Sequence, residues 1–140
     1  MRLRVRYSKK GKVRFTSHRD VARIWERALR RVGLGMAYSQ GFSPRPKLSF
    51  GLALSTGHES EAEFLELELS DEEGEAAGWS TERSVDLAER LTEALPIGLD
   101  VVAVAPVEKG ESLQQAVTSC TWSIEVDGVD MEQMNAWVAD

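Results

Sequence analysis

The sequence predicts an α+β fold: a ferredoxin-like βαββαβ sandwich over residues 1–106, followed by a linker and the start of a further βα unit over residues 107–140. Alternating apolar residues recur at the strand period, and other segments carry apolar residues at helical spacing. Their order favours one sheet with both helices packed on one face. A length of 140 residues suits a single core, so we expect the second unit to be truncated.

The first strand is predicted at residues 2–8, where apolar side chains alternate with arginines. After a turn, the alternation resumes at residues 12–15 and extends both the apolar and the basic face. A helix follows, because Ser17 is a favourable N-cap residue, apolar residues then recur at helical spacing, and Gly33 ends the run.

Residues 42–54 show the most regular alternation of the chain. Apolar residues and prolines occupy the even positions, from Phe42 onward, so we expect one extended segment with its even side buried. Its first part is expected to be an arm or an edge strand, because Pro44 and Pro46 cannot donate hydrogen bonds to a sheet.

The later elements are predicted in the same way. Residues 60–69 indicate a strand whose alternation slips, which a bulge near Phe64–Leu65 would reconcile. Residues 71–75 indicate a solvated loop, and a second helix is expected from about Thr81. The core side of this helix is expected to carry Val85, Ala88, Leu91 and Leu95.

The C-terminal part is predicted to complete the sheet and to begin the truncated unit. Residues 99–105 indicate the last strand of the sandwich. After a loop rich in Gly and Glu, a strand is expected at residues 121–126 and a helix from about Asp130.

The net charge of −6 conceals an uneven distribution. Residues 1–50 contain fourteen basic and two acidic residues, a net charge of +12; residues 51–140 contain three basic and twenty-one acidic residues, a net charge of −18. An anion-binding surface is therefore compatible with an acidic chain. No apolar run reaches the roughly 18–20 residues of a membrane span, and Cys120 has no partner for a disulfide, so we expect a cytoplasmic protein without membrane contact.

Catalytic motifs are absent from the sequence: we find no GxxxxGK[ST], GxGxxG, GxSxG or HExxH pattern. His18, His58 and Cys120 show no metal-ligand spacing, so neither a metal nor a cofactor is expected. His18, at a helix start, and His58, beside Glu59, are the best candidates for a general base, if folding brings them together. The alternative is that His18 marks a helix start and His58 an exposed loop, and an enzyme is the less favoured class.

A basic surface is the stronger functional signal, because arginine suits phosphate and each phosphate contact releases counterions. The predicted nucleic-acid contacts are Arg4, Arg6, Lys12, Arg14, Arg19, Arg23, Arg27, Ser43, Arg45 and Lys47. The alternative is that this surface is neutralised by Glu61, Glu63, Glu66 and Glu68. Since no aromatic ladder accompanies the bases, structured RNA (a tRNA or rRNA element) or a phosphorylated cofactor is favoured over a sequence-specific single strand.

Four stretches resemble a known family: Phe15–Asp20, Arg23–Arg31, Gly41–Gly51 and Thr56–Ser60. They are similar to the radical-SAM-linked protein family, a bacterial domain of unknown function often fused to a radical SAM enzyme or encoded beside one. The resemblance covers about residues 1–105 and rests mainly on the unusual run GFSPRPKLSFG. It implies a radical SAM protein as partner and supplies no catalytic residues.

Three functions follow as hypotheses. The first is an accessory domain that presents RNA, or another phosphate-bearing ligand, to a radical SAM enzyme. The second is a small hydrolase or nuclease-like enzyme that uses His18 and His58. The third is a scaffold that docks a protein through the acidic half of the chain.

Overall fold

The computed structural model describes residues 1–75, 78–108, 110 and 112–139. The strands are β1 (Arg2–Lys9), β2 (Leu48–Phe50), β3 (Ser60–Glu68) and β4 (Leu99–Val107). The helices are the 3-10 helix η1 (Gly11–Phe15), α1 (His18–Val32), α2 (Asp71–Glu75), α3 (Thr81–Ala94), α4 (Leu113–Ala116) and α5 (Met131–Val138).

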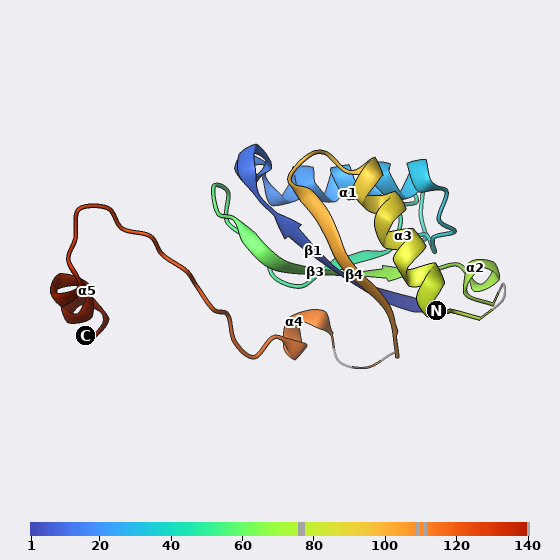
Figure 1. The fold of residues 1–140 in the computed structure, drawn as a ribbon. Coiled ribbons are helices and arrows are strands. Elements are labelled where there is room, and N and C mark those ends of the chain that lie inside the picture. Colours follow the sequence, from blue (N-terminus) through green and yellow to red (C-terminus); the bar gives the residue numbers. More distant parts are fainter. Residues whose placement is uncertain (76–77, 109, 111, 140) are drawn as a thin grey trace.

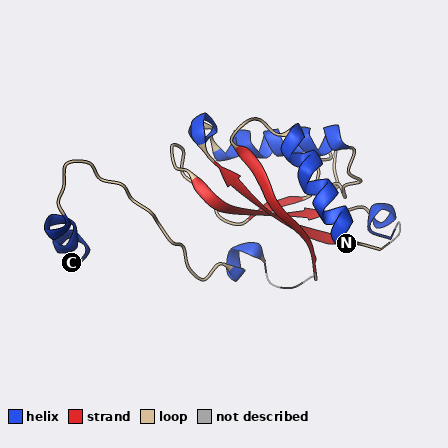
Figure 2. Ribbon diagram, viewed as in Figure 1, coloured by secondary structure: helices blue, strands red, loops and turns tan. Residues whose placement is uncertain are grey.

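The strands form an antiparallel sheet in the order β2-β3-β1-β4. Figure 1 shows α1 and α3 together on one face of this sheet, and Figure 2 shows the same two layers by element type. The short helix α4 lies on the other side of the sheet (Figure 1). The α+β fold is therefore as predicted, and the face opposite α1 and α3 is hereafter the outer face.

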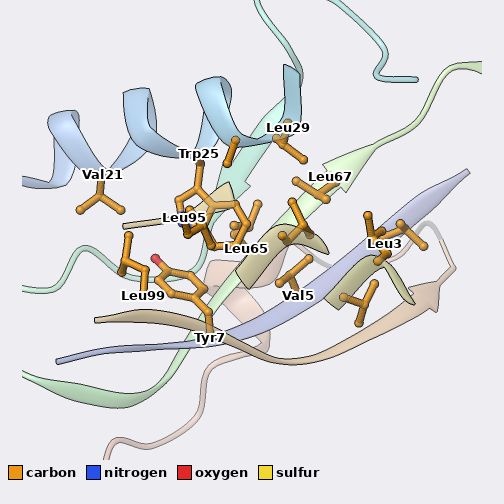
Figure 3. Close-up of a cluster of buried hydrophobic side chains, with 14 of the residues drawn as sticks. Leu3, Val5, Tyr7, Val21, Trp25, Leu29, Leu65, Leu67, Leu95 and Leu99 are labelled. Atoms are coloured by element: carbon orange, nitrogen blue, oxygen red, sulfur yellow. The ribbon is translucent and has the colours of Figure 1, made fainter. Parts of the chain in front are cut away.

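The core lies between the sheet and the two helices (Figure 3). The fully buried Trp25 ring meets the Tyr7 ring edge-on, with ring centroids 5.0 Å apart. Leu91 of α3 is buried in the same cluster, and Leu48 and Phe50 of β2 pack against it. Because side chains alternate along a strand, the inward placement of Tyr7 and its apolar neighbours directs the arginines of β1 to the outer face.

The first helix forms as its end signals predict. The Ser17 hydroxyl accepts a hydrogen bond from the Asp20 amide at 3.2 Å, which satisfies one free amide of the first turn. Gly33 adopts a left-handed conformation (φ 70°), and its amide donates to the Arg30 carbonyl. The apolar stripe between these ends packs on the sheet and leaves the arginines of α1 in solvent.

The expected strand at residues 12–15 is wrong, because the chain forms the 3-10 helix η1 there. Gly11 has a positive φ of 68° and turns the chain away from the sheet, so only Val13 of this segment is buried. The buried Lys9 holds the turn, since its Nζ donates to the Thr16 carbonyl at 2.9 Å. Lys12 and Arg14 consequently lie on η1 and not on the outer face.

The expected single extended segment over residues 42–54 is also only partly formed. Residues 48–50 make strand β2 at the sheet edge, with Leu48 and Phe50 inward and Ser49 exposed, as the alternation requires. Phe42, by contrast, is fully exposed, because residues 39–45 form a loop instead of an arm along the sheet.

Three smaller details differ. The pairing of β1 with β3 shifts its register between Tyr7 and Lys9 of β1, whereas residues 64–65 of β3 pair without a bulge. In α3, Leu87 and not Val85 faces the core, because a spacing of four places Leu87 on the face of Leu91. Residues 71–75, expected as a loop, form α2.

The C-terminal segment is helical where predicted but lacks the predicted strand. Asp130 caps α5, its carboxylate accepting from the Gln133 amide at 2.9 Å. Residues 121–126 form no strand, because no described strand pairs with their backbone. Figure 1 shows the chain between α4 and α5 running away from the sheet.

Candidate nucleic-acid interface

Residues 39–45 form a loop that is closed at its base and borders the outer face near the N-terminal end of β1. The Ser39 amide donates to the Arg45 carbonyl at 2.9 Å, and the Arg45 amide donates to the Ser39 hydroxyl at 3.1 Å. Tyr38 and Pro46 form an antiparallel bridge below these contacts. The loop neck is therefore fixed by hydrogen bonds to the Arg45 backbone, which place Arg45 beside β2.

A cleft of about 430 Å³ lies between this loop and the outer face of the sheet. Its walls are Arg2, Ser39, Arg45, Pro46, Lys47, Leu48, Ser49, Glu66 and Glu68. Three bases, two hydroxyls and two carboxylates thus line one concave surface. Arginine and lysine side chains with hydroxyl donors are a set that binds phosphate oxygens.

The two carboxylates hold several of the bases in place. Glu66 is only 4% exposed and accepts from Arg4 at 2.6 Å and from Arg2 at 3.3 Å. Glu68 pairs with Lys47 at 3.3 Å. In the described part of the chain, Arg6 and Arg45 have no ion-pair partner.

The expected neutralisation is therefore partial and comes from two of the four expected carboxylates. Glu61 instead pairs with Lys10 at 2.6 Å, at the opposite end of β1. Glu63 lies near Tyr7 and Lys9, and its negative charge acts to raise the pKa of both groups. On the outer face, five bases stand against two carboxylates, and the surface keeps a positive charge.

The structure divides the predicted basic residues between separate surfaces. Arg4, Arg6, Arg45 and Lys47 lie on or beside the outer face, and Ser43 is exposed in the loop next to it. Lys12 and Arg14 lie on η1, at the other end of β1, as Figure 1 shows. There Arg14 pairs with Glu59 at 3.4 Å and lies over the Phe15 ring.

The arginines of α1 form a third surface. Arg19, Arg23 and Arg27 are exposed on the solvent side of α1, in the layer that covers the opposite face of the sheet (Figure 1). Arg23 lies 3.6 Å from Asp20 of its own helix. A single patch that joins these residues to Arg45 and Lys47 is therefore not formed within this domain.

The two histidines pack against different aromatic rings. His18 packs edge-on against Phe50 with centroids 4.9 Å apart, and His58 packs against Trp122 at 5.7 Å. Among the described residues, neither imidazole is hydrogen-bonded to a carboxylate, and no group of three or more His, Cys, Asp or Glu side chains could hold a metal ion. Cys120 is exposed and forms no disulfide.

Sequence reasoning missed a buried ionisable pair at the far end of β1. Burial lowers the pKa of Lys9, which the nearby Glu63 charge partly opposes. Burial also raises the pKa of Tyr7, and the same carboxylate adds to that rise. The alternation of β1 places Lys9 on the same inward side as Leu3, Val5 and Tyr7. This position was missed because the strand was predicted to end at residue 8.

In the described residues, no helix combines the length and apolarity needed to cross a membrane. The family described as "Uncharacterized protein conserved in bacteria (DUF2344)" matches residues 2–140, so the chain belongs to that family. A search of curated proteins finds no match.

Proposed function

We propose that this DUF2344 chain is a binding domain for structured RNA, such as a tRNA or rRNA element, and that it serves a radical SAM enzyme as an accessory subunit. The observation that carries the RNA proposal is the cleft beside β2, in which Arg45, Lys47 and Arg2 converge. Arg45 has no carboxylate partner among the described residues, and hydrogen bonds fix the backbone on both sides of it. The guanidinium group is thus free to bind a phosphate from a fixed position on the backbone, and its planar fork matches two phosphate oxygens.

The character of the surface supports backbone contacts over base reading. On the β4 side, the arginines of the outer face adjoin the small side chains of Ala103 and Ala105, and on the β3 side they adjoin Phe64, Glu66 and Glu68. Phosphate contacts position a nucleic acid without reading its sequence. A free phosphorylated cofactor would use the same donors. RNA is favoured because the bases continue along β1 beyond the cleft, through Arg4 and Arg6.

Two further parts of the proposal have other support. The ferredoxin-like assignment is supported by the chain order β1, α1, β2, β3, α3 and β4, with the short helices set aside. The radical SAM partner is supported by the resemblance of residues 41–51 and their neighbours to the radical-SAM-linked family. Such a partner and its RNA would meet this domain in the cytoplasm.

RNA titrations at several salt concentrations test the proposal. The parent protein is expected to bind a tRNA with an affinity that falls steeply with salt, and the double variant R45A/K47A should flatten the log–log slope by roughly one to two. The matched control is R27A/R30A, which removes the same charge from the solvent side of α1. If both double variants weaken binding equally, net charge and not the cleft is responsible.

The partner is tested separately in cells. Crosslinking the chain in its own host, followed by identification of the attached protein and nucleic acid, should recover a radical SAM enzyme together with RNA. Recovery of RNA without such an enzyme would leave the cleft proposal standing and contradict the accessory role.

A further inference from the structure

Phe42 is the most exposed large apolar side chain among the described residues, at 110% of its reference exposure. It lies at the middle of the loop closed by Ser39 and Arg45, between Gly41 and Ser43. The residue therefore contributes nothing to the core, and packing gives no reason for an aromatic ring at this position.

The loop holds Phe42 at a defined place beside the cleft. Two hydrogen bonds join Ser39 to Arg45, and the Lys47 amide donates to the Ala37 carbonyl at 2.9 Å one step further down. Ser39 and Arg45 both line the cleft, so the loop that carries Phe42 stands at the border of the basic surface. An exposed aromatic ring thus accompanies an arginine without a carboxylate partner on the same short loop.

The neighbours of Phe42 indicate which partner it suits. Gln40, Gly41 and Ser43, which adjoin Phe42 in the chain, are exposed and polar or small, and the other exposed apolar groups of the loop are Pro44 and the half-exposed ring of Tyr38 at its base. An exposed ring on the same loop as a phosphate-binding arginine suits the flat face of a nucleobase, which stacks on aromatic side chains when it is unpaired.

We propose that Phe42 stacks on an unpaired base of the bound RNA while Arg45 and Lys47 hold the adjoining phosphates; this inference rests on the proposed function. The domain then selects RNA that offers a loop, a bulge or a frayed end next to a helical segment. A continuous duplex would engage the cleft without the ring.

The test compares two hairpins that differ only in one bulged nucleotide, replaced by 2-aminopurine for fluorescence. F42A should lower the affinity for the bulged hairpin by about 5-fold to about 150-fold, the range for loss of one stacked base, and leave the affinity for the paired hairpin unchanged. The salt slope should not change, because no charge is removed. F42W should retain the affinity and the change in 2-aminopurine fluorescence.

The control is I97A, because Ile97 is equally free of contacts, at 100% exposure, but adjoins Gly98 at the η1 end of the sheet. Unchanged binding by F42A, with loss in R45A/K47A, would overturn the stacking and leave the RNA proposal intact. Equal loss on both hairpins would also overturn it. If the parent binds neither hairpin and F42A loses a crosslinked protein partner instead, Phe42 is a protein-docking residue and both proposals fail.

Discussion

Replacing Glu66 by Gln tests whether the buried carboxylate restrains the bases of the outer face. Arg4 reaches one Glu66 oxygen through Nε at 3.1 Å and Nη2 at 2.6 Å, and Arg2 reaches the other at 3.3 Å. Glutamine keeps the shape and one carbonyl acceptor but removes the charge. We expect the free energy of unfolding to fall by about 1–3 kcal/mol, the range for charged hydrogen bonds. The full cost of breaking a buried pair does not apply, because the two arginine side chains are 25% and 34% exposed.

The same substitution should strengthen RNA binding, because it leaves two guanidinium groups without their carboxylate. Each additional phosphate contact steepens the slope of log affinity against log salt by roughly 0.7–0.9. Urea unfolding followed by tryptophan fluorescence measures the first effect, and RNA titrations at four salt concentrations measure the second.

The matched control for this experiment is E61Q, which removes one negative charge from the same strand. The Lys10–Glu61 pair lies at the far end of β1, and its side chains are 45% and 79% exposed. Its loss should leave both the free energy of unfolding and the salt slope nearly unchanged, because solvent screens an exposed pair. If E66Q binds RNA with the parent's slope, or more weakly, Arg2 and Arg4 are structural ions and the reasoning about the outer face is refuted.

Three further predictions concern the stability of the η1 end of the sheet. G98A should lower the free energy of unfolding by roughly 3 kcal/mol, because Gly98 has φ 101° and an added Cβ would clash with the Lys10 carbonyl oxygen. The control is G33A: Gly33 has φ 70° but open space around it, so this variant should cost about 1 kcal/mol in the same urea titration. The folded-state pKa of Lys9 is lowered from 10.5, so the unfolded chain binds more protons below that pH and stability should rise as the pH approaches it. K9M should abolish this rise, and it should lower the free energy of unfolding at pH 7 by about 1–3 kcal/mol because the Thr16 carbonyl loses its donor. The folded-state pKa of Tyr7 is raised from 10.0, so stability should fall again above that pH, and Y7F should remove this fall in unfolding curves measured from pH 7 to 11. A flat pH profile in the parent would contradict both assignments.

Local signals in the sequence predicted the elements that depend on local chemistry. The caps at Ser17 and Gly33 and the alternation of β1 were sufficient to place α1 and the first strand. The inward placement of Leu48 and Phe50 followed from the same alternation. Caps and alternation depend on residues that are close together in the sequence, so a single sequence is enough to predict them.

The site could be predicted only in composition. Its bases were identified, but their division between the outer face, η1 and α1 depends on the turn at Gly11 and on which layer each element joins. Alternation suggested that Phe42 is buried, because the pattern cannot distinguish a strand from a loop closed by contacts such as Ser39 to Arg45. The pairing of Glu66 with the bases of β1 needed the register of β1 against β3.

The outer face is open on one side only. At the end of β2 away from the cleft, Leu113 of α4 packs over Gly51, and the Gln114 side chain donates to the Phe50 carbonyl at 2.6 Å. Toward β4, by contrast, the residues paired with Arg4 and Arg6 are Ala105 and Ala103, whose short side chains leave the guanidinium groups accessible. A bound strand would therefore pass from the cleft along β1 toward β4.

This path sets an upper limit on the salt dependence. Residues on one side of a strand repeat about every 6.7 Å, so Arg2, Arg4 and Arg6 form a row of about 13 Å. With Arg45 and Lys47 in the cleft, the outer face offers five bases, and the slope of log affinity against log salt should not exceed roughly 3.5–4.5 in magnitude. A steeper slope would mean that RNA also contacts the arginines of α1, which only a nucleic acid that wraps from one layer of the domain to the other could reach. The R27A/R30A variant would then flatten the slope, and the assignment of binding to the outer face alone would be wrong.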